Sequence, residues 1–310
     1  MADFQHQSVL LEQAVDALVT DRDGFYIDGT FGRGGHARKI LSNLSGQGKL
    51  LVVDKDPQAI DEARRLQEQD PRLIVAHSSF ADIVDLAGTH DVVGQVSGVL
   101  LDLGVSSPQL DDAERGFSFT KDGPLDMRMN TEAGLTAEQW LAAASEEEMA
   151  RVFFEYGEEK FSRRIARAIA DVRKHSPINR TLQLAEIVKQ ANPAWEKHKH
   201  PATRVFQAIR IHVNDELRDL EKSLEGIVEV LKTGGRMVVI SFHSLEDRLI
   251  KRFIAREERG DDFPPDMPVT QAQLNPRVKR VGRQLKADTT EVAGNIRARS
   301  AVLRVAEKIA

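Results

Sequence analysis

The fold is decided by residues 25–36, which read Phe-Tyr-Ile-Asp-Gly-Thr-Phe-Gly-Arg-Gly-Gly-His. A short apolar run meets a glycine-rich loop here, and apolar residues at helical spacing follow over 37–44. Glycines let the backbone turn tightly and approach a ligand without a Cβ in the way. Free N–H groups at the start of a helix suit a carboxylate or a phosphate. The stretch predicts a strand, a ligand-binding loop and a helix, with a plain tight turn as the simpler alternative.

Similar apolar runs recur on either side of the middle of the chain. They predict strands at 25–27, 50–53, 73–75, 99–101, 237–240 and 301–305. Helical patterns cover 9–18, 37–44 and 59–66, and a long amphipathic stripe runs from Phe206 to Leu231, ended by Gly234 and Gly235. Continuous apolar runs are expected where a parallel strand is buried on both faces. The alternation predicts an α/β fold with a doubly wound, Rossmann-like sheet.

The middle of the chain has no convincing strand pattern. Thr136 and Ser145 each begin a sequence that fits a helix capping box. We therefore expect a discontinuous main domain of residues 1–110 and 204–310, with an all-helical domain for substrate recognition inserted at 111–203.

Composition excludes several classes of protein. The 310-residue chain has no cysteine, which excludes disulfides, zinc–thiolate sites and iron–sulfur clusters. No apolar run is long enough to span a bilayer, and residues 1–6 do not resemble a secretory signal. We expect a cytoplasmic protein without a membrane partner or a metal site.

Two acids accompany the glycine loop. Asp54 ends the second predicted strand, where an acid can accept hydrogen bonds from both ribose hydroxyls of a nucleoside. A dinucleotide and S-adenosylmethionine both fit that layout. Asp28 precedes the glycines, where it could neutralise an ammonium group but would repel a pyrophosphate. The glycine spacing also departs from G-x-G-x-x-G. S-adenosylmethionine is favoured, and a nicotinamide-dependent oxidoreductase remains the alternative.

Further polar groups follow the third, fourth and fifth strands. Phe80 could stack on an adenine or simply belong to the core. S-adenosylmethionine donates a methyl group, and the amino nitrogen of a nucleic-acid base is a poor nucleophile for it. Asp102 is our candidate catalytic residue, which would accept a hydrogen bond from the N–H of that amino group. Methylation at carbon 5 of a pyrimidine usually needs a thiolate, which this chain lacks. For His243 we favour a structural, hydrogen-bonded role over that of a general base.

The net charge of −5 does not indicate nucleic-acid binding, but basic residues are concentrated near the C-terminus. Residues 275–304 contain eight basic and two acidic side chains. This distribution fits either a solvated surface or a patch that faces phosphates. The candidate RNA contacts are Lys199, His200, Arg204, Arg277, Lys279 and Arg280.

Long motifs resemble those of one known family. They lie at 6–10, 26–36, 101–112, 115–119, 123–129, 199–204 and 241–248, and the similarity spans about residues 6–305. They resemble the bacterial 16S ribosomal RNA cytosine-N4 methyltransferases. The resemblance implies a class I S-adenosylmethionine-dependent methyltransferase fold with an inserted helical domain. It also implies methylation of N4 of a decoding-centre cytidine in 16S ribosomal RNA, with the small ribosomal subunit as partner.

The resemblance also implies a set of cofactor contacts. Carried over by motif, these are Gly34, Gly35, His36, Asp54, Phe80, Asp102 and Gln109. Gln109 enters through the resemblance alone. Asp102 is followed by Leu103-Gly104 instead of the Pro-Pro-aromatic motif of many amino-group methyltransferases. It stays open whether Asp102 contacts the cofactor, the target amine or both. A non-catalytic RNA-binding assembly factor is a second alternative.

Overall fold

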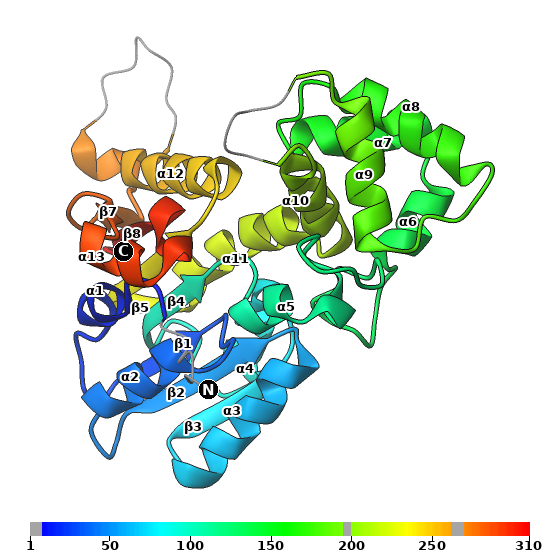
Figure 1. Cartoon of the computed structure of the whole chain (residues 1–310). Coiled ribbons are helices and arrows are strands. Elements are labelled where there is room, and N and C mark those ends of the chain that lie inside the picture. Colours follow the sequence, from blue (N-terminus) through cyan, green and yellow to red (C-terminus); the bar gives the residue numbers. More distant parts are fainter. Residues whose placement is uncertain (1–7, 195–199, 262–269) are drawn as a thin grey trace. The chain divides into compact units, whose positions relative to one another are not determined.

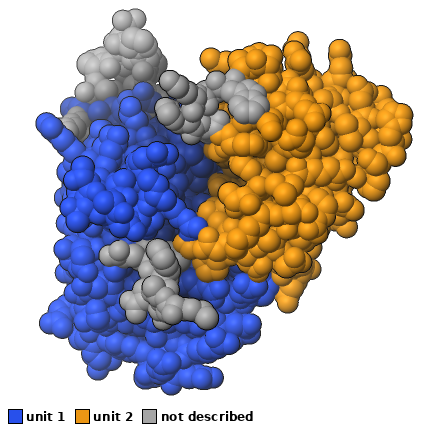
Figure 2. Space-filling view, viewed as in Figure 1, with its two compact units in different colours: residues 1–104, 217–310 blue, residues 105–216 orange. Residues whose placement is uncertain are grey.

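The computed structural model describes residues 8–194, 200–261 and 270–310 (Figure 1). The chain forms two compact units, which are coloured separately in Figure 2. The first combines Met1–Gly104 with Leu217–Ala310, and the second is Val105–Glu216. Each unit has a hydrophobic core of its own.

The first unit is built on an eight-stranded sheet with the order β3-β2-β1-β4-β5-β8-β6, and β7 pairs with β8. Strands β1 to β5 run parallel, while β8 is antiparallel to β5, β6 and β7. The strands are β1 Phe25–Asp28, β2 Lys49–Asp54, β3 Leu73–His77, β4 Val96–Asp102, β5 Leu231–Ser241, β6 Val278–Arg280, β7 Leu285–Lys286 and β8 Val302–Lys308. All the strands predicted from apolar runs are present, and β6 and β7 are additional.

Helices cover both faces of this sheet. They are α1 Leu11–Leu18, α2 Gly35–Asn43, α3 Pro57–Gln69, α4 Ile83–Thr89, α11 Glu216–Val230, α12 Ser244–Arg259 and α13 Thr289–Gly294, with short 3-10 turns η1 Phe80–Asp82, η3 Gln271–Leu274 and η4 Ile296–Ser300. Leu50 and Val52 of β2 join one core cluster with α1, α2 and α3. Leu51 and Val53 join another with α4, α11 and α12. Because successive strand residues point to opposite faces, the apolar run is buried on both sides. The doubly wound α/β fold is confirmed.

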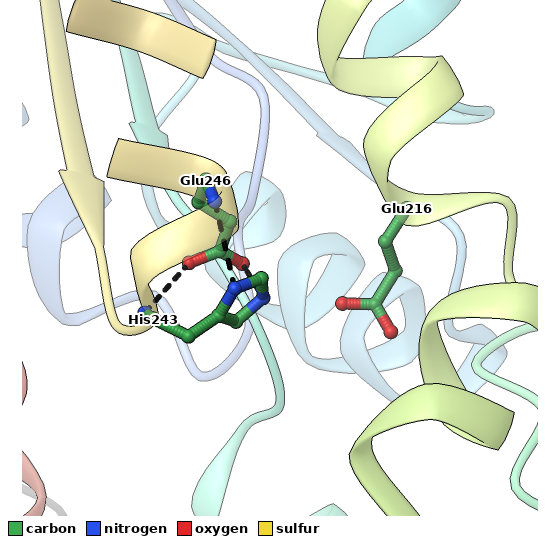
Figure 3. Close-up of side chains that lie close together, drawn as sticks. All are labelled: Glu216, His243 and Glu246. Atoms are coloured by element: carbon green, nitrogen blue, oxygen red, sulfur yellow. Dashed lines mark hydrogen bonds and ion pairs between the residues drawn. The ribbon is translucent and has the colours of Figure 1, made fainter. Parts of the chain in front are cut away.

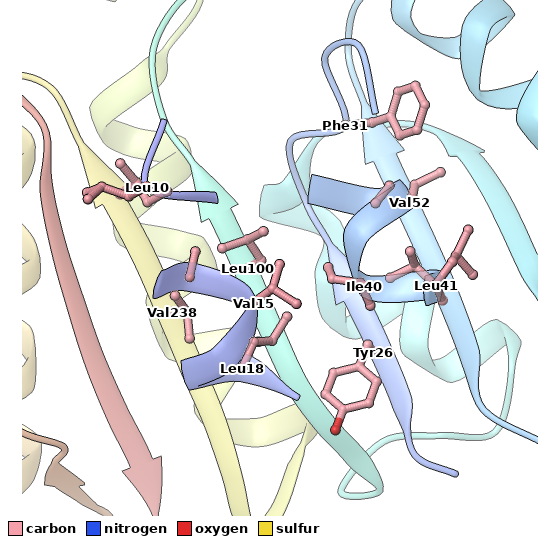
Figure 4. Packing of buried hydrophobic residues seen from close by; sticks show 14 of the residues in the cluster. Leu10, Val15, Leu18, Tyr26, Phe31, Ile40, Leu41, Val52, Leu100 and Val238 are labelled. Carbon is pink, nitrogen blue, oxygen red and sulfur yellow. The ribbon is translucent and has the colours of Figure 1, made fainter. Parts of the chain in front are cut away.

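The core cluster that contains Leu50 and Val52 also packs α1 and α2 against the sheet. Figure 4 shows Val15 of α1 beside Leu100 and Val238, and Ile40 of α2 beside Val52. Each of these five side chains is at most 1% exposed. Burying an aliphatic side chain of this size contributes about 1.5–3 kcal/mol. The loop between β1 and α2 is therefore held between two rigid elements.

The second unit is helical. Its helices are α5 Ser107–Asp111, α6 Ala137–Ala143, α7 Glu146–Glu155, α8 Ser162–Arg173, α9 Thr181–Ala191 and α10 Ala202–Val213, with one 3-10 turn, η2 Ala113–Arg115. Among its described residues the backbone makes one isolated β-bridge, between Pro124 and Arg180. Thr136 caps α6 through the predicted capping box with Gln139. The side chain of Ser145 accepts a hydrogen bond from the N–H of Glu148 and so caps α7.

The second unit is longer than the insertion expected at 111–203. The apolar face of α10, including Val205 and Ile209, is buried in the core of this unit. The single helix predicted from Phe206 to Leu231 is wrong, because α10 and α11 are separate. Asp215 has a positive φ of 54° at the break. The chain turns there because the carboxamide of Asn214 is held within the second unit.

The carboxamide of Asn214 makes three hydrogen bonds. It accepts one from the N–H of Met129 at 2.7 Å and donates to the carbonyl of Met127 at 2.8 Å and of Arg210 at 2.9 Å. These bonds satisfy polar groups at the end of α10 and stop the helix. A pattern of apolar residues alone does not reveal such a break.

Gly234 and Gly235 do not end a helix, because β5 already begins at Leu231. The pairing of β4 with β5 changes register between Leu231 and Arg236, and Gly234 has a positive φ of 81° in that interval. The glycines therefore shape an irregular strand entry. Within the described residues, no helix is both long and apolar enough to cross a membrane.

Candidate functional site

Three carboxylates end three neighbouring strands of the first unit. Asp28 ends β1, Asp54 ends β2 and Asp102 ends β4, and the sheet order places β2, β1 and β4 side by side. The carboxyl ends of parallel strands are where doubly wound sheets bind ligands. The sequence predicted all three positions.

The glycine loop closes over this edge of the sheet. The N–H of Gly29 donates to the carbonyl of Leu100 at 2.9 Å. Gly32 and Gly34 have positive φ values of 55° and 74°, a region that favours glycine. A Cβ on Gly35 would lie 2.0 Å from Oγ of Ser8. Glycine is therefore required at these positions by backbone conformation or by space.

Asp54 ties the loop to β2. Its Oδ2 accepts a hydrogen bond from the N–H of Gly32 at 2.8 Å, and its Oδ1 accepts from the N–H of Asp56 at 2.9 Å. Removal from water raises the pKa of Asp54 to about 6, although these backbone hydrogen bonds oppose the shift. The side chain is only half-buried, so its carboxylate remains accessible beside the loop.

Asp28 is 1% exposed and incompletely satisfied. Its Oδ1 accepts a hydrogen bond from the N–H of Thr30 at 3.1 Å, whereas its Oδ2 is buried and has no partner among the described residues. Burial raises the pKa of Asp28 to about 7, and the charge of Asp54 adds to the shift. A buried carboxylate oxygen without a donor favours a cationic or hydrogen-bond-donating ligand.

Asp102 lies beside His36, a histidine in the first turn of α2. Oδ2 of Asp102 is 3.6 Å from Nδ1 of His36, and its Oδ1 is buried without a hydrogen-bond partner in the described part of the chain. Burial raises the pKa of Asp102 well above its ordinary value, and the charges of Asp28 and Glu246 raise it further. The Asp102 side chain is 24% exposed, so part of it can meet a ligand at this edge.

Phe80 begins η1 directly after β3. Its side chain is half-buried and packs against the core cluster formed with α4, α11 and α12. A Cβ on Gly29 would lie 3.0 Å from the Cβ of Phe80, so the aromatic residue borders the glycine loop. Phe80 thus contributes to the core and stands next to the loop, and both interpretations of it remain open.

Gln109 belongs to the second unit. It is 6% exposed, and its Oε1 accepts a hydrogen bond from the N–H of Ser106 at 2.9 Å, which completes the capping box of α5. The structure therefore gives Gln109 a local structural role. Its predicted contact with the cofactor remains a prediction.

Comparison with known proteins decides the family. Residues 3–309 match the MraW methylase family. The chain belongs to this family. Ribosomal RNA small subunit methyltransferase H of Chromohalobacter salexigens is 58% identical over 309 residues, which cover 99% of this chain and 93% of that protein. The protein of the same name from Marinomonas sp. is 53% identical over 305 residues, covering 98% and 97%.

Membership confirms the main predictions from the sequence. This methylase has the class I S-adenosylmethionine-dependent fold, and its cofactor is S-adenosylmethionine. The two alternatives, a nicotinamide-dependent oxidoreductase and a non-catalytic assembly factor, are not favoured.

The predicted RNA contacts of the first unit are all ion-paired in the methylase. Arg277 binds Glu257 and also Glu225, the latter at 3.2 Å. Lys279 lies 2.7 Å from Glu307. Arg280 binds Glu258. Acids distant in the sequence therefore offset these positive charges, which weakens the case for them as phosphate contacts.

The predicted RNA contacts of the second unit have structural partners too. The ring of His200 lies 4.7 Å from the ring of Phe119, and its Nδ1 accepts a hydrogen bond from the N–H of Ala202 at 3.2 Å. Arg204 donates to the carbonyl of Glu158 at 3.3 Å. Lys199 lies outside the described residues. Their contact with RNA remains a prediction.

His243 caps α12 of the methylase. Its ring accepts a hydrogen bond from the N–H of Glu246, and its Nε2 lies 3.0 Å from Oε1 of the same glutamate (Figure 3). Oε2 of Glu246 accepts from the N–H groups of Phe242 and His243 at 2.8 and 3.2 Å. This geometry supports the structural interpretation of His243. Glu216, also drawn in Figure 3, belongs to the second unit, where it pairs with Arg210 at 2.7 Å.

Proposed function

We propose that this enzyme transfers the methyl group of S-adenosylmethionine to N4 of a cytidine in 16S ribosomal RNA of the small ribosomal subunit, in the cytoplasm. The names of both relatives support a small-subunit RNA substrate. The observation that carries the chemistry is Asp102, which ends β4 with one buried carboxylate oxygen unpartnered among the described residues.

The charge of the edge fits S-adenosylmethionine. The buried oxygens of Asp28 and Asp102 without described partners call for positive charge or hydrogen-bond donors. The cofactor has a sulfonium and an ammonium group, whereas a dinucleotide would bring a pyrophosphate that three carboxylates repel. Asp28 would bind the ammonium group and Asp54 the ribose hydroxyls. Phe80 would contact the adenine.

The loop supplies the remaining contacts. Gly34, Gly35 and His36 begin α2, whose first N–H groups suit the carboxylate of the cofactor. No atom lies within 4 Å of a Cβ built on Gly32, so the backbone is open to a ligand there. Gln109 is kept as a proposed cofactor contact through the family motif alone.

Asp102 is the residue that acts on the acceptor. When bound, S-adenosylmethionine supplies a methyl carbon attached to a positively charged sulfur that is a good leaving group. The amino nitrogen of cytosine is a weak nucleophile because its lone pair is delocalised into the ring. A carboxylate that accepts its N–H localises the lone pair and orients it. Asp102 then takes the proton that the nitrogen releases as the C–N bond forms.

The choice of a nitrogen acceptor agrees with the composition. The chain lacks the cysteine thiolate that methylation at carbon 5 usually needs. The target base must leave its stack to reach a site at the edge of a sheet. We assign recognition of the surrounding RNA to the second unit, Val105–Glu216, where His200 and Arg204 are the candidate contacts.

Asp102→Ala tests this role against the assembly-factor alternative. We expect turnover on unmodified small subunits to fall by about 10²–10⁴-fold, while the protein stays folded and RNA affinity stays close to wild type. Asp16→Asn, an exposed acid on α1, is the matched control and should keep full turnover. Unchanged turnover of Asp102→Ala would refute the catalytic role.

A further inference from the structure

A basic pocket lies between α12 and the turn that joins β6 to β7. It encloses about 290 Å³ of space open to solvent. Four of its lining residues are cations, and none is an acid: Lys251, Arg280, Arg283 and Arg304. All belong to the first unit. One of these four cations, Arg280, is also a candidate RNA contact from the sequence. The other three cations were not among those candidates.

Two of the four cations are paired with acids that are not among the lining residues. Arg304 is 12% exposed and binds both carboxylate oxygens of Asp247, at 2.7 and 3.1 Å. It also donates to Oε1 of Gln284 at 2.7 Å. Arg280 binds Glu258. These pairs hold the guanidinium groups in place and offset their charge.

The other two cations are exposed and have no counter-charge among the residues that the structure describes. Neither Lys251 on α12 nor Arg283 in the turn makes a hydrogen bond or an ion pair within the described residues. Gly282, which also lines the pocket, has a φ of 68° and no atom within 4 Å of a Cβ built on it. Among the described residues, the pocket thus combines two cations without ion pairs, Lys251 and Arg283, with two guanidinium groups held by ion pairs.

We propose that this pocket binds a phosphate group of the RNA backbone, with Lys251 and Arg283 as the contacts. The proposal rests on the proposed RNA substrate and deepens it. An arginine fork and a lysine ammonium are the side chains that proteins use for phosphate oxygens. Such contacts position RNA without reading its sequence. Lys251 and Arg283 therefore replace the ion-paired Arg277 and Lys279 as the phosphate contacts of this unit.

The test compares charge reversal inside and beside the pocket. The double variant Lys251→Glu/Arg283→Glu is measured against Arg252→Glu, which changes the next residue of the same helix. Arg252 is exposed and does not line the pocket. Binding of a fluorescein-labelled single-stranded RNA is followed by anisotropy between about 50 and 200 mM salt. The double variant Lys251→Gln/Arg283→Gln repeats the test in case charge reversal perturbs folding.

We expect the pocket variants to bind the RNA about tenfold more weakly at low salt, with the slope of log affinity against log salt reduced by about one. Arg252→Glu should stay within about twofold of wild type. Equal losses in the pocket and control variants would overturn the proposal. The thermal shift that inorganic phosphate causes is measured on the wild type and the same variants. If RNA affinity is unchanged but this shift is lost in the pocket variants, the pocket takes free phosphate and the RNA assignment is wrong.

Activity is measured separately on the same preparations. If the wild type methylates RNA and the pocket variants keep their RNA affinity, the pocket proposal is wrong and the proposed function stands. If the wild type methylates no RNA, the proposed function fails, and the anisotropy measurement still decides whether the pocket binds an RNA phosphate.

Discussion

Nδ1 of His36 lies 3.6 Å from Oδ2 of Asp102, while Nε2 of the same ring lies 3.2 Å from the carbonyl oxygen of Val9. A carbonyl oxygen can only accept, so Nε2 carries a proton. Nδ1 then faces the carboxyl group of Asp102. The imidazole of His36 is therefore held between the Val9 carbonyl and the Asp102 carboxyl group.

This arrangement makes His36 a positioning residue for Asp102. We expect His36→Gln to lower kcat by about tenfold to a hundredfold and to change the pH profile of kcat, because glutamine lacks the titratable ring that faces the Asp102 carboxyl group. The KM for S-adenosylmethionine should change less. His90→Gln, which alters an exposed histidine of the same unit, is the control. A pH profile identical to wild type would mean that His36 only supports the loop.

The affinity for S-adenosylmethionine should depend on pH. The pKa values of Asp28 and Asp54 in the free protein are raised to about 7 and about 6 by burial. Below these values a proton must leave each acid before it can serve the cofactor. Calorimetry should show affinity falling as the pH drops from about 8 to about 5.5, by up to about tenfold per unit for each proton released. A flat response would contradict the assignment of both acids.

In the protein without cofactor, Asp28 should lower the free energy of unfolding at neutral pH. Its pKa is raised from 3.8 to about 7, so between these values the folded state holds a proton that the unfolded state has lost. The free energy of unfolding therefore falls as the pH rises through this window, by at most about 4 kcal/mol. Asp28→Asn removes this penalty and should bind the cofactor poorly.

The measurement for Asp28→Asn is thermal unfolding without cofactor from about pH 4 to pH 8. Its midpoint relative to wild type should rise with pH up to about 7 and then level off, because unfolding of the wild type releases a proton in this window and unfolding of the variant does not. A difference between the two proteins that does not vary with pH would show that Asp28 is not protonated at low pH in the folded state.

The loop glycines give a prediction about stability. At Gly34 the φ is 74°, and an added Cβ would lie 2.6 Å from the ring of Phe31. Gly34→Ala should lower the free energy of unfolding by about 1–2 kcal/mol from the backbone conformation alone. Gly46→Ala is the matched control, since no atom lies within 4 Å and its φ is not positive. Chemical denaturation measures both, and equal stabilities would contradict the loop geometry.

The sequence predicted the elements that depend on continuous apolar runs. The strands that end at Asp28, Asp54 and Asp102 could be located because each combines a run buried on both faces with an acid at its carboxyl end. The edge of the sheet that holds the three acids followed from parallel topology. Their roles with the cofactor stay proposals.

Features that depend on distant partners could not be predicted. The helix break at Asn214 is set by hydrogen bonds to Met127 and Met129, far away in the chain. Charge counting favoured Arg277 and Lys279 as phosphate contacts, but their partners Glu257 and Glu307 lie on α12 and β8. The proximity of His36 to Asp102 likewise appears only when the loop has folded onto β4.

The most direct test of the central claim is mass-spectrometric nucleoside analysis of 16S ribosomal RNA. Unmodified small subunits, and free 16S RNA in parallel, are incubated with S-adenosylmethionine and either the wild type or Asp102→Ala. We predict N4-methylated cytidine with the wild type and a loss of at least about a hundredfold with the variant. A methyl group on another atom, or no new methyl group on either substrate, would contradict the proposed function.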